Sequence, residues 1–158
     1  MDTEIKVGPP VITISQGRTF MVTTRTGEIR PDSDEGVYAL DTRFVSFYRL
    51  YINRMPLEVI NSSQLTFYAA RCHLTNPKIN TEGGIIDAQT LNITVDRLVD
   101  EGIHEEFEII NYSGKKVLFL FELSLRSDFA DIFEVKNHDI IQRGQVETTW
   151  DKDNRQLR

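Results

Sequence analysis

The sequence lacks the features that mark several large classes of protein. Its 158 residues contain one cysteine, Cys72, so no internal disulfide can form. No stretch approaches the ~20 apolar residues of a membrane span. Residues 1–10 contain no apolar core of signal-peptide length. These absences predict a cytoplasmic protein that makes no use of a membrane and depends on its hydrophobic core.

Basic charge and ligand motifs are also scarce. The chain has 18 lysine and arginine residues against 24 aspartate and glutamate residues, and its formal net charge is −6. A nucleic acid would be repelled by this balance, and no basic stripe offsets it. No glycine-rich phosphate-binding pattern occurs. Cys72 and His73 are adjacent, so on a strand their side chains point to opposite faces and share no metal ion. We therefore expect no nucleic acid, no metal and no cofactor.

Helical periodicity is nearly absent, and period-two alternation takes its place. In Leu91–Val99 the side chains of Leu91, Ile93, Val95 and Val99 point to one face of a predicted strand, while the residues between them are mostly polar. The turn at residues 100–102 and the stretch 103–110 supply an antiparallel partner. This pattern predicts a sheet with one wet side and one buried side.

The rest of the chain also has the sequence pattern of short strands separated by turns. Residues 117–121 are apolar on both faces, which predicts a central strand covered on both sides. Further strands are expected over residues 11–15, 19–24, 37–52, 57–60, 65–74, 85–89 and 139–149. The predicted fold is all-β over residues 1–158: a single antiparallel β-sandwich, or a supersandwich-like variant of it, with little or no helix. Closure into a barrel stays open, and the turn-like C-terminus suggests a fragment of a longer multidomain protein.

Two polar clusters could carry chemistry. In the stretch 126–134, Asp128, Asp131 and Glu134 could supply an acid/base pair for glycoside hydrolysis, which needs two carboxyl groups roughly 5–9.5 Å apart. A structural role is favoured, because aspartate at turns accepts hydrogen bonds from backbone N–H groups. Under that interpretation Arg126 pairs with one of the two aspartates.

Aromatic residues surround these charges. Phe129 and Phe133 have the character of core anchors. In the other cluster, residues 36–46, Asp41 and Arg43 interrupt an apolar strand region, and a buried charge there needs a partner. Two interpretations stay open: the two charges are satisfied within this domain, or they face a partner surface.

Three tyrosines, Tyr48, Tyr51 and Tyr68, could form a face on which sugar rings stack, since an aromatic ring offers apolar area with a polar tip. Burial in the core or in an interface is the favoured alternative.

Residues 36–46, the first signature segment, fit the pattern G-x-Y-x-x-D-T-R-F-x-S. Residues 126–135, the second signature segment, contain D-F-A-D-x-F-E-V. With Gly17-Arg18-Thr19-Phe20 and Gly27-Glu28-Ile29 near the start, the chain resembles the N-terminal domain of bacterial glycogen-debranching-type proteins, the amylo-α-1,6-glucosidases. One departure is Asn53-Arg54, where that family more often has Asn-Gly.

The resemblance implies a β-sandwich domain that precedes a helical (α/α)6-barrel domain of the same protein. The barrel is expected to hydrolyse α-1,6-glucosidic branch points, so no catalytic residue is expected in this chain. The motif residues are then structural or form an interface: Tyr38, Asp41, Thr42, Arg43, Phe44, Arg126, Asp128, Phe129, Asp131, Phe133 and Glu134.

Other functions remain open beside this one. The chain could be a carbohydrate-binding module that holds α-glucan through its tyrosines, or a self-contained enzyme that uses its three clustered acids. An unfinished sheet could also pair with a second copy of the chain to form a homo-oligomer.

Overall fold

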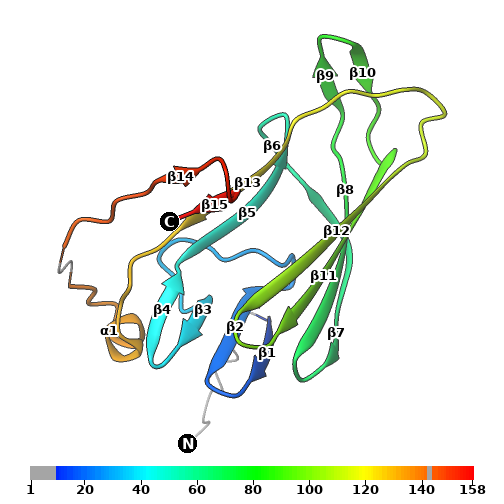
Figure 1. The fold of residues 1–158 in the computed structure, drawn as a ribbon. Helices are drawn as coiled ribbons and strands as arrows, with labels where there is room; N and C mark the ends of the chain where they lie inside the picture. The colour runs from blue at the N-terminus through cyan, green and yellow to red at the C-terminus, as the bar shows by residue number, and fades with distance from the viewer. Residues whose placement is uncertain (1–9, 142–143) are drawn as a thin grey trace, which may run out of the picture.

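The computed structural model describes residues 10–141 and 144–158. Antiparallel strands dominate it, and one short helix occurs among these residues (Figure 1). The elements in chain order are β1 (Val11–Gln16), β2 (Thr19–Thr24), β3 (Gly36–Ala39), β4 (Thr42–Val45), β5 (Phe47–Ile52), β6 (Met55–Pro56), β7 (Glu58–Thr66), β8 (Ala69–Thr75), β9 (Ile79–Thr81), β10 (Gly84–Ile86), β11 (Leu91–Val99), β12 (Ile103–Asn111), β13 (Phe121–Arg126), α1 (Ile132–Asn137), β14 (Trp150–Asp151) and β15 (Gln156–Leu157).

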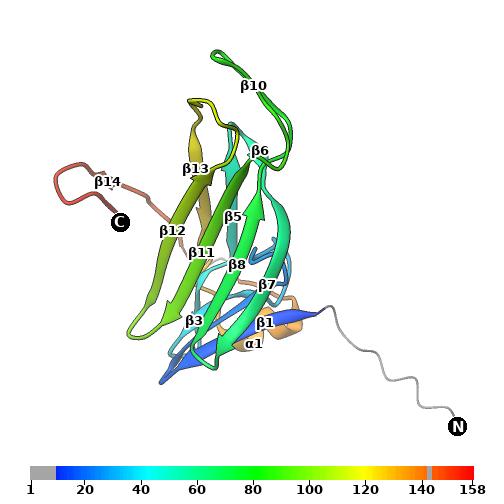
Figure 2. The ribbon, with the colours of Figure 1, turned by 90° about the vertical axis from the view of Figure 1, so that its right-hand side faces the viewer.

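The strands form two layers. One layer is the sheet β12-β11-β8-β7, and the other combines the sheets β13-β5-β6 and β1-β2-β3-β4 (Figure 2). The core between them contains Ile93 and Val95 from β11, Leu50 and Ile52 from β5, and Met21 from β2. The prediction of an all-β antiparallel fold with little helix is confirmed.

The β11–β12 hairpin follows the sequence pattern closely. Leu91, Ile93, Val95 and Val99 are buried, and β12 runs antiparallel to β11 after the turn at residues 100–102. The alternation also buries Arg97 on the same face, which the sequence interpretation passed over.

Several predicted strands differ from the observed ones. The stretch 37–52 divides into three strands. Leu40 and Asp41 both have left-handed φ values, 50° and 63°, and form a tight hairpin turn between β3 and β4, and a bend at Ser46 separates β4 from β5. The stretch 65–74 is interrupted because a turn at Phe67 and Tyr68 joins β7 to β8. Of residues 85–89, the strand β10 keeps only the first two.

Two predictions near the C-terminus are wrong. The stretch 117–121 is not a central strand, since β13 begins only at Phe121 and ends its sheet on one side. In the described part of residues 139–149 no strand occurs, and β14 begins at Trp150. Residues 117–120 and the described part of residues 139–149 belong to no strand, although residues 117–121 are a continuous apolar run.

The turn at Asn53-Arg54 forms a hairpin although glycine is missing. Asn53 has a φ of 47° and Arg54 a φ of 64°, the left-handed pair of a two-residue hairpin turn. Asn53 Oδ1 accepts a hydrogen bond of 2.7 Å from the N–H of Leu120, and this contact helps to hold the turn.

Arg97 is the centre of a buried polar network. Its Nε donates to Glu105 Oε1 at 2.6 Å, and its Nη1 donates to the carbonyl of Gly27 at 2.6 Å. The Tyr48 ring lies 4.6 Å from the guanidinium, and the Tyr48 hydroxyl donates to Glu105 Oε2 at 2.8 Å. Burial opposes the charge, but Glu105 raises the pKa of Arg97 above its usual value. The network fastens the loop after β2 to the opposite sheet.

This network predicts that Gly27 has no room for a side chain. Gly27 has a φ of 76°, and a Cβ there would lie 2.9 Å from Arg97 Nη1 and 2.9 Å from Cys72 Sγ. Gly17→Ala is the matched control, since Gly17 has a φ of 61° and no neighbour within 4 Å. Both substitutions place alanine at a left-handed φ, so the free-energy cost of that conformation is common to the two variants. We expect Gly27→Ala to lower the free energy of unfolding by roughly 1–3 kcal/mol more than Gly17→Ala, as measured by urea titration. Equal losses would contradict the close packing around Arg97.

Candidate functional site

The two signature segments lie side by side although they are far apart in the sequence. Thr42 and Asp131 form an isolated antiparallel bridge. Three backbone hydrogen bonds join the segments: Arg43 N to Ala130 O at 2.8 Å, Ile132 N to Asp41 O at 2.9 Å, and Ser46 N to Arg126 O at 2.8 Å. The second segment therefore follows the free side of β4 before α1 begins.

A buried ion pair connects the same two segments. Arg43 is only 2% exposed, and it binds Asp128 through both oxygens, Nη2 to Oδ2 at 2.5 Å and Nε to Oδ1 at 3.2 Å. Its Nη1 donates to the carbonyls of Ser33 at 2.6 Å and Glu35 at 3.3 Å. Burial works against the cation, but Asp128 raises the pKa of Arg43 above its usual value. The charge of Arg43 is thus satisfied within the domain.

Asp41, the other charge in the first segment, has a different environment. Its carbonyl accepts the bond from Ile132, while its side chain is exposed at the β3–β4 turn. Of the two interpretations left open for Asp41 and Arg43, the internal partner therefore holds for Arg43.

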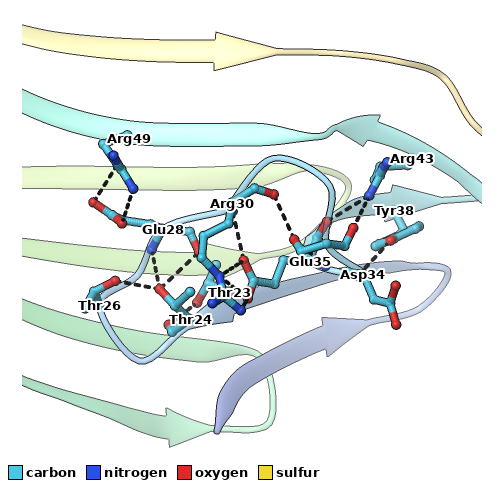
Figure 3. Close-up of polar contacts among 11 residues, drawn as sticks. Thr23, Thr24, Thr26, Glu28, Arg30, Asp34, Glu35, Tyr38, Arg43 and Arg49 are labelled. Carbon is cyan, nitrogen blue, oxygen red and sulfur yellow. Dashed lines mark hydrogen bonds and ion pairs between the residues drawn. The ribbon is translucent and has the colours of Figure 1, made fainter. Parts of the chain in front are cut away.

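Ion pairs also hold the loop between β2 and β3, residues 25–35 (Figure 3). Glu28 pairs with Arg49 of β5 at 3.0 Å, and the buried Glu35 pairs with Arg30 at 2.6 Å. Between them Ile29 forms a bridge to Tyr48 and is fully buried. Figure 3 shows Arg43 at the end of this loop, above the Glu35 carbonyl. The loop, β5 and the first signature segment are therefore one connected unit.

The three clustered acids have structural partners. Asp128 binds Arg43, as described above. Asp131 caps α1, its Oδ1 accepting from the N–H of Phe133 at 2.8 Å, and Glu134 Oε2 accepts from the N–H of Asp131 at 3.0 Å. This reciprocal arrangement is a capping box. It ties Asp131 and Glu134 to the start of one helix, where both carboxylates accept hydrogen bonds from backbone N–H groups.

The contacts of Arg126 and the exposure of Phe129 and Phe133 differ from the sequence-based predictions. The partner of Asp128 is Arg43, and the Arg126 guanidinium instead lies 5.2 Å from the centre of the Phe47 ring. Phe129 and Phe133 are not core anchors, because both side chains are exposed. The helix is too short to bury both faces, and of its six residues only Val135 is buried.

Four apolar side chains surround the junction of the two segments, and we call them the signature face: Leu40, Phe44, Phe129 and Phe133. Phe44 and Phe129 contact each other edge to face, with ring centres 5.8 Å apart. Leu40 is 66% exposed and Phe133 is 69% exposed. Leu40 and Phe129 also have left-handed φ values of 50° and 51°, a strained conformation for large side chains. Strain together with apolar exposure is typical of a surface built for contact.

The signature face borders a hollow in the described part of the molecule. The hollow has a volume of about 790 Å³ and is lined by Phe44 and Phe129 on one side. Ile140, Ile141 and Val146 line it on the other side. Polar side chains, among them Asp128, Gln145 and Glu147, complete its lining.

The three tyrosines do not form one exposed row. Tyr48 is buried under Arg97, and burial raises the pKa of its hydroxyl. Tyr51 on β5 and Tyr68 in the β7–β8 turn are half-buried, and the Tyr68 ring packs edge to face on Phe67. The Tyr48 ring is thus closed to a sugar from solvent.

Residues 10–141 and 144–158 also bear on metal binding and membrane insertion. No group of three or more histidine, cysteine, aspartate or glutamate side chains gathers there as a metal site would require. Within the same residues, no helix is long and apolar enough to cross a membrane.

Sequence reasoning missed two buried charged residues that hold this region. Arg97 would have been found by extending the alternation of β11, which places position 97 on the face of Val95 and Val99. Glu35 carried no such signal, because its burial depends on the conformation of the loop after β2.

Comparison with known families identifies one match. The model of a family described as the N-terminal domain of (some) glycogen debranching enzymes matches residues 14–158. The matched stretch includes both signature segments, so the resemblance drawn from those motifs is confirmed. A search of curated proteins finds no match.

The buried pair predicts an asymmetry between two aspartates of the chain. Asp128→Asn leaves the guanidinium of Arg43 buried without a counter-charge, and we expect it to lower the free energy of unfolding by about 3 kcal/mol, near the lower end of the range for buried pairs. The matched control is Asp96→Asn, which removes a two-pronged contact to Arg71 on the surface and should cost less than about 1 kcal/mol. Urea titrations measure both. A smaller loss for Asp128→Asn than for Asp96→Asn would contradict the assigned role.

Proposed function

The chain belongs to the family of N-terminal domains of some glycogen debranching enzymes, and on this basis we propose that it is a non-catalytic accessory domain. It packs against a helical (α/α)6-barrel domain of the same protein, and that barrel hydrolyses the α-1,6 branch points. The accessory domain helps to shape the α-glucan cleft of the barrel, and the whole protein acts in the cytoplasm.

The engagement of the signature carboxylates carries this proposal. Asp128 neutralises a buried arginine, and Asp131 and Glu134 cap a helix, so all three already serve the fold. A general acid or nucleophile needs a carboxyl group that is free to meet the glycosidic bond. The three acids of the second signature segment are thus explained by their roles in the fold.

The signature face supplies the surface for packing. Exposed apolar side chains are common one at a time, but Leu40, Phe44, Phe129 and Phe133 gather at one junction. Contact with a partner removes their apolar area from water, and aromatic residues are enriched in such contacts. The ion pairs beneath the face hold it in place, which lowers the entropy lost on docking.

Two equally exposed phenylalanines provide a test of the packing surface. Phe133 on the signature face is 69% exposed, and Phe67 in the β7–β8 turn is 66% exposed. We expect Phe133→Ser to weaken binding to the separately produced helical domain of a debranching enzyme of this family by about tenfold or more, the loss typical of an interface hot spot. Phe67→Ser should leave the affinity unchanged in calorimetric titrations. Equal effects of the two changes would place the packing surface elsewhere.

Activity assays separate this proposal from its alternatives. We expect the purified chain to hydrolyse neither α-1,6 nor α-1,4 glucan bonds and to show no retention on immobilised glycogen. The physical reason is the engagement of its acids and the burial of Tyr48. Hydrolysis that is lost in Asp131→Asn would show a self-contained enzyme, and retention on glycogen would show a carbohydrate-binding module.

A further inference from the structure

The strand β13 leaves one edge of its sheet unpaired. The strand order is β13-β5-β6, and the N–H of Asn53 donates to the carbonyl of Leu120. Hydrogen bonds in an antiparallel pair involve alternate residues, so the N–H and C=O groups of Leu123 and Leu125 point away from β5. This edge offers a row of free backbone groups.

The side chains at this edge are also incompletely buried. Leu123 lies opposite Leu50 and Leu125 opposite Tyr48, so both leucines point to the inner face of the sheet. They are nevertheless 44% and 42% exposed. An additional strand beside β13 would cover them.

The corresponding edge of the other layer is protected against such pairing. Glu106 and Glu108 alternate along β12, and both side chains are exposed. Charged side chains on an edge strand discourage the addition of another strand. The β13 edge has Glu122 and Arg126 near its two ends and only Leu123, Ser124 and Leu125 between them.

The segment 145–150 has the complementary properties. Thr149 exchanges both backbone hydrogen bonds with Arg158, so alternation turns the N–H and C=O groups of Thr148 and Trp150 away from β15. Val146, Thr148 and Trp150 share one face of an extended chain, and Gln145, Glu147 and Thr149 share the other. Trp150 is 56% exposed.

The segment lies close to the edge that it fits. The 790 Å³ hollow has Ser127 and Asp128, directly after β13, in one wall and residues 144–148 in the other. Figure 2 shows β14 standing away from the two layers, on the side of β12 and β13. A two-stranded hairpin such as β14–β15 has little stability without a sheet or core to pack against.

We propose that residues 145–150 add to the free edge of β13 as an antiparallel strand and close the sandwich. Trp150 then lies opposite Leu123, Thr148 opposite Leu125, and Glu147 opposite Arg126. The two inner-face leucines and Trp150 are covered, and Glu147 meets an opposite charge on the outer face. The pairing ends at Asp151, because in this register Asp151 would lie opposite Glu122, a like charge, and its carboxylate instead binds the N–H groups of Asp153 and Asn154.

This closure has a consequence for the signature face. In the open arrangement Ile140, Ile141 and Val146 line the hollow opposite Phe44 and Phe129. Movement of Val146 toward β13 opens that hollow to a partner. Residues 145–150 therefore have two positions. In the open position they lie beside the signature face, and in the closed position they pair with β13. Only this consequence depends on the proposed accessory function.

The single tryptophan of the chain reports the closure directly. In the closed chain we expect Trp150 emission to be blue-shifted, and iodide quenching to be several times weaker than in the urea-unfolded chain. Leu123→Ser should reverse both effects, while the control Ile109→Ser, at the β12 edge, should reverse neither. Quenching of the native chain as strong as that of the unfolded chain would overturn the proposal.

A cross-link tests the register without relying on a destabilising change. Ser124 and Thr149 would form a pair without mutual hydrogen bonds, with Cα atoms about 4.5 Å apart, within the range for a disulfide. We expect Ser124→Cys with Thr149→Cys to oxidise to an intramolecular disulfide, seen by mass spectrometry, while the buried Cys72 stays reduced. The control Ser124→Cys with Thr148→Cys, whose side chains point to opposite faces, should not. No disulfide, equal yields or a cross-linked dimer would contradict the closure. These assays use the chain alone, so they are independent of any catalytic domain.

Discussion

A buried guanidinium that needs a carboxylate is the constraint on which this domain depends. Arg43 is almost fully enclosed, and Asp128, 85 residues later in the chain, supplies its counter-charge. Because a buried charge without a partner costs several kcal/mol, the second signature segment has to return to β4. The bridge between Thr42 and Asp131 lies directly after that return, and α1 with its capping box begins there. The signature residues are thus explained as parts of one joint.

Charge and apolar area are distributed in an unusual way around this joint. Arg43 and Arg97 lie inside with their carboxylate partners, while Leu40 and Phe133 lie outside. A buried ion pair adds little net stability, but the loss of one partner is strongly destabilising, so the pair holds together the segments that it joins. A rigid joint with apolar side chains on its surface is suited to packing against another domain. Such a domain is in keeping with the family, whose members are N-terminal domains of some glycogen debranching enzymes.

Sequence patterns predicted the parts of the fold that depend on local alternation. The strand β11 and its return along β12 agree with their pattern, because each has one buried and one wet face. Left-handed turns at residues without glycine, such as Leu40-Asp41, had no local signal. The helix α1 was missed because six residues are too short for a periodic stripe, although its capping box was present in Asp131 and Glu134. The partner of Arg43 could not be chosen from sequence, since Asp128 and Asp131 are both near in the motif and only the fold separates them.

The most direct test of the account is the coupling between Arg43 and Asp128. The free energy of unfolding would be measured for the unchanged chain, Arg43→Met, Asp128→Asn and the double variant. If the two side chains form the joint, the double variant loses less stability than the two single losses added together, by roughly 2–3 kcal/mol. Losses that add to within about 0.5 kcal/mol would show that the two residues act separately, and the joint between the signature segments would have to lie elsewhere.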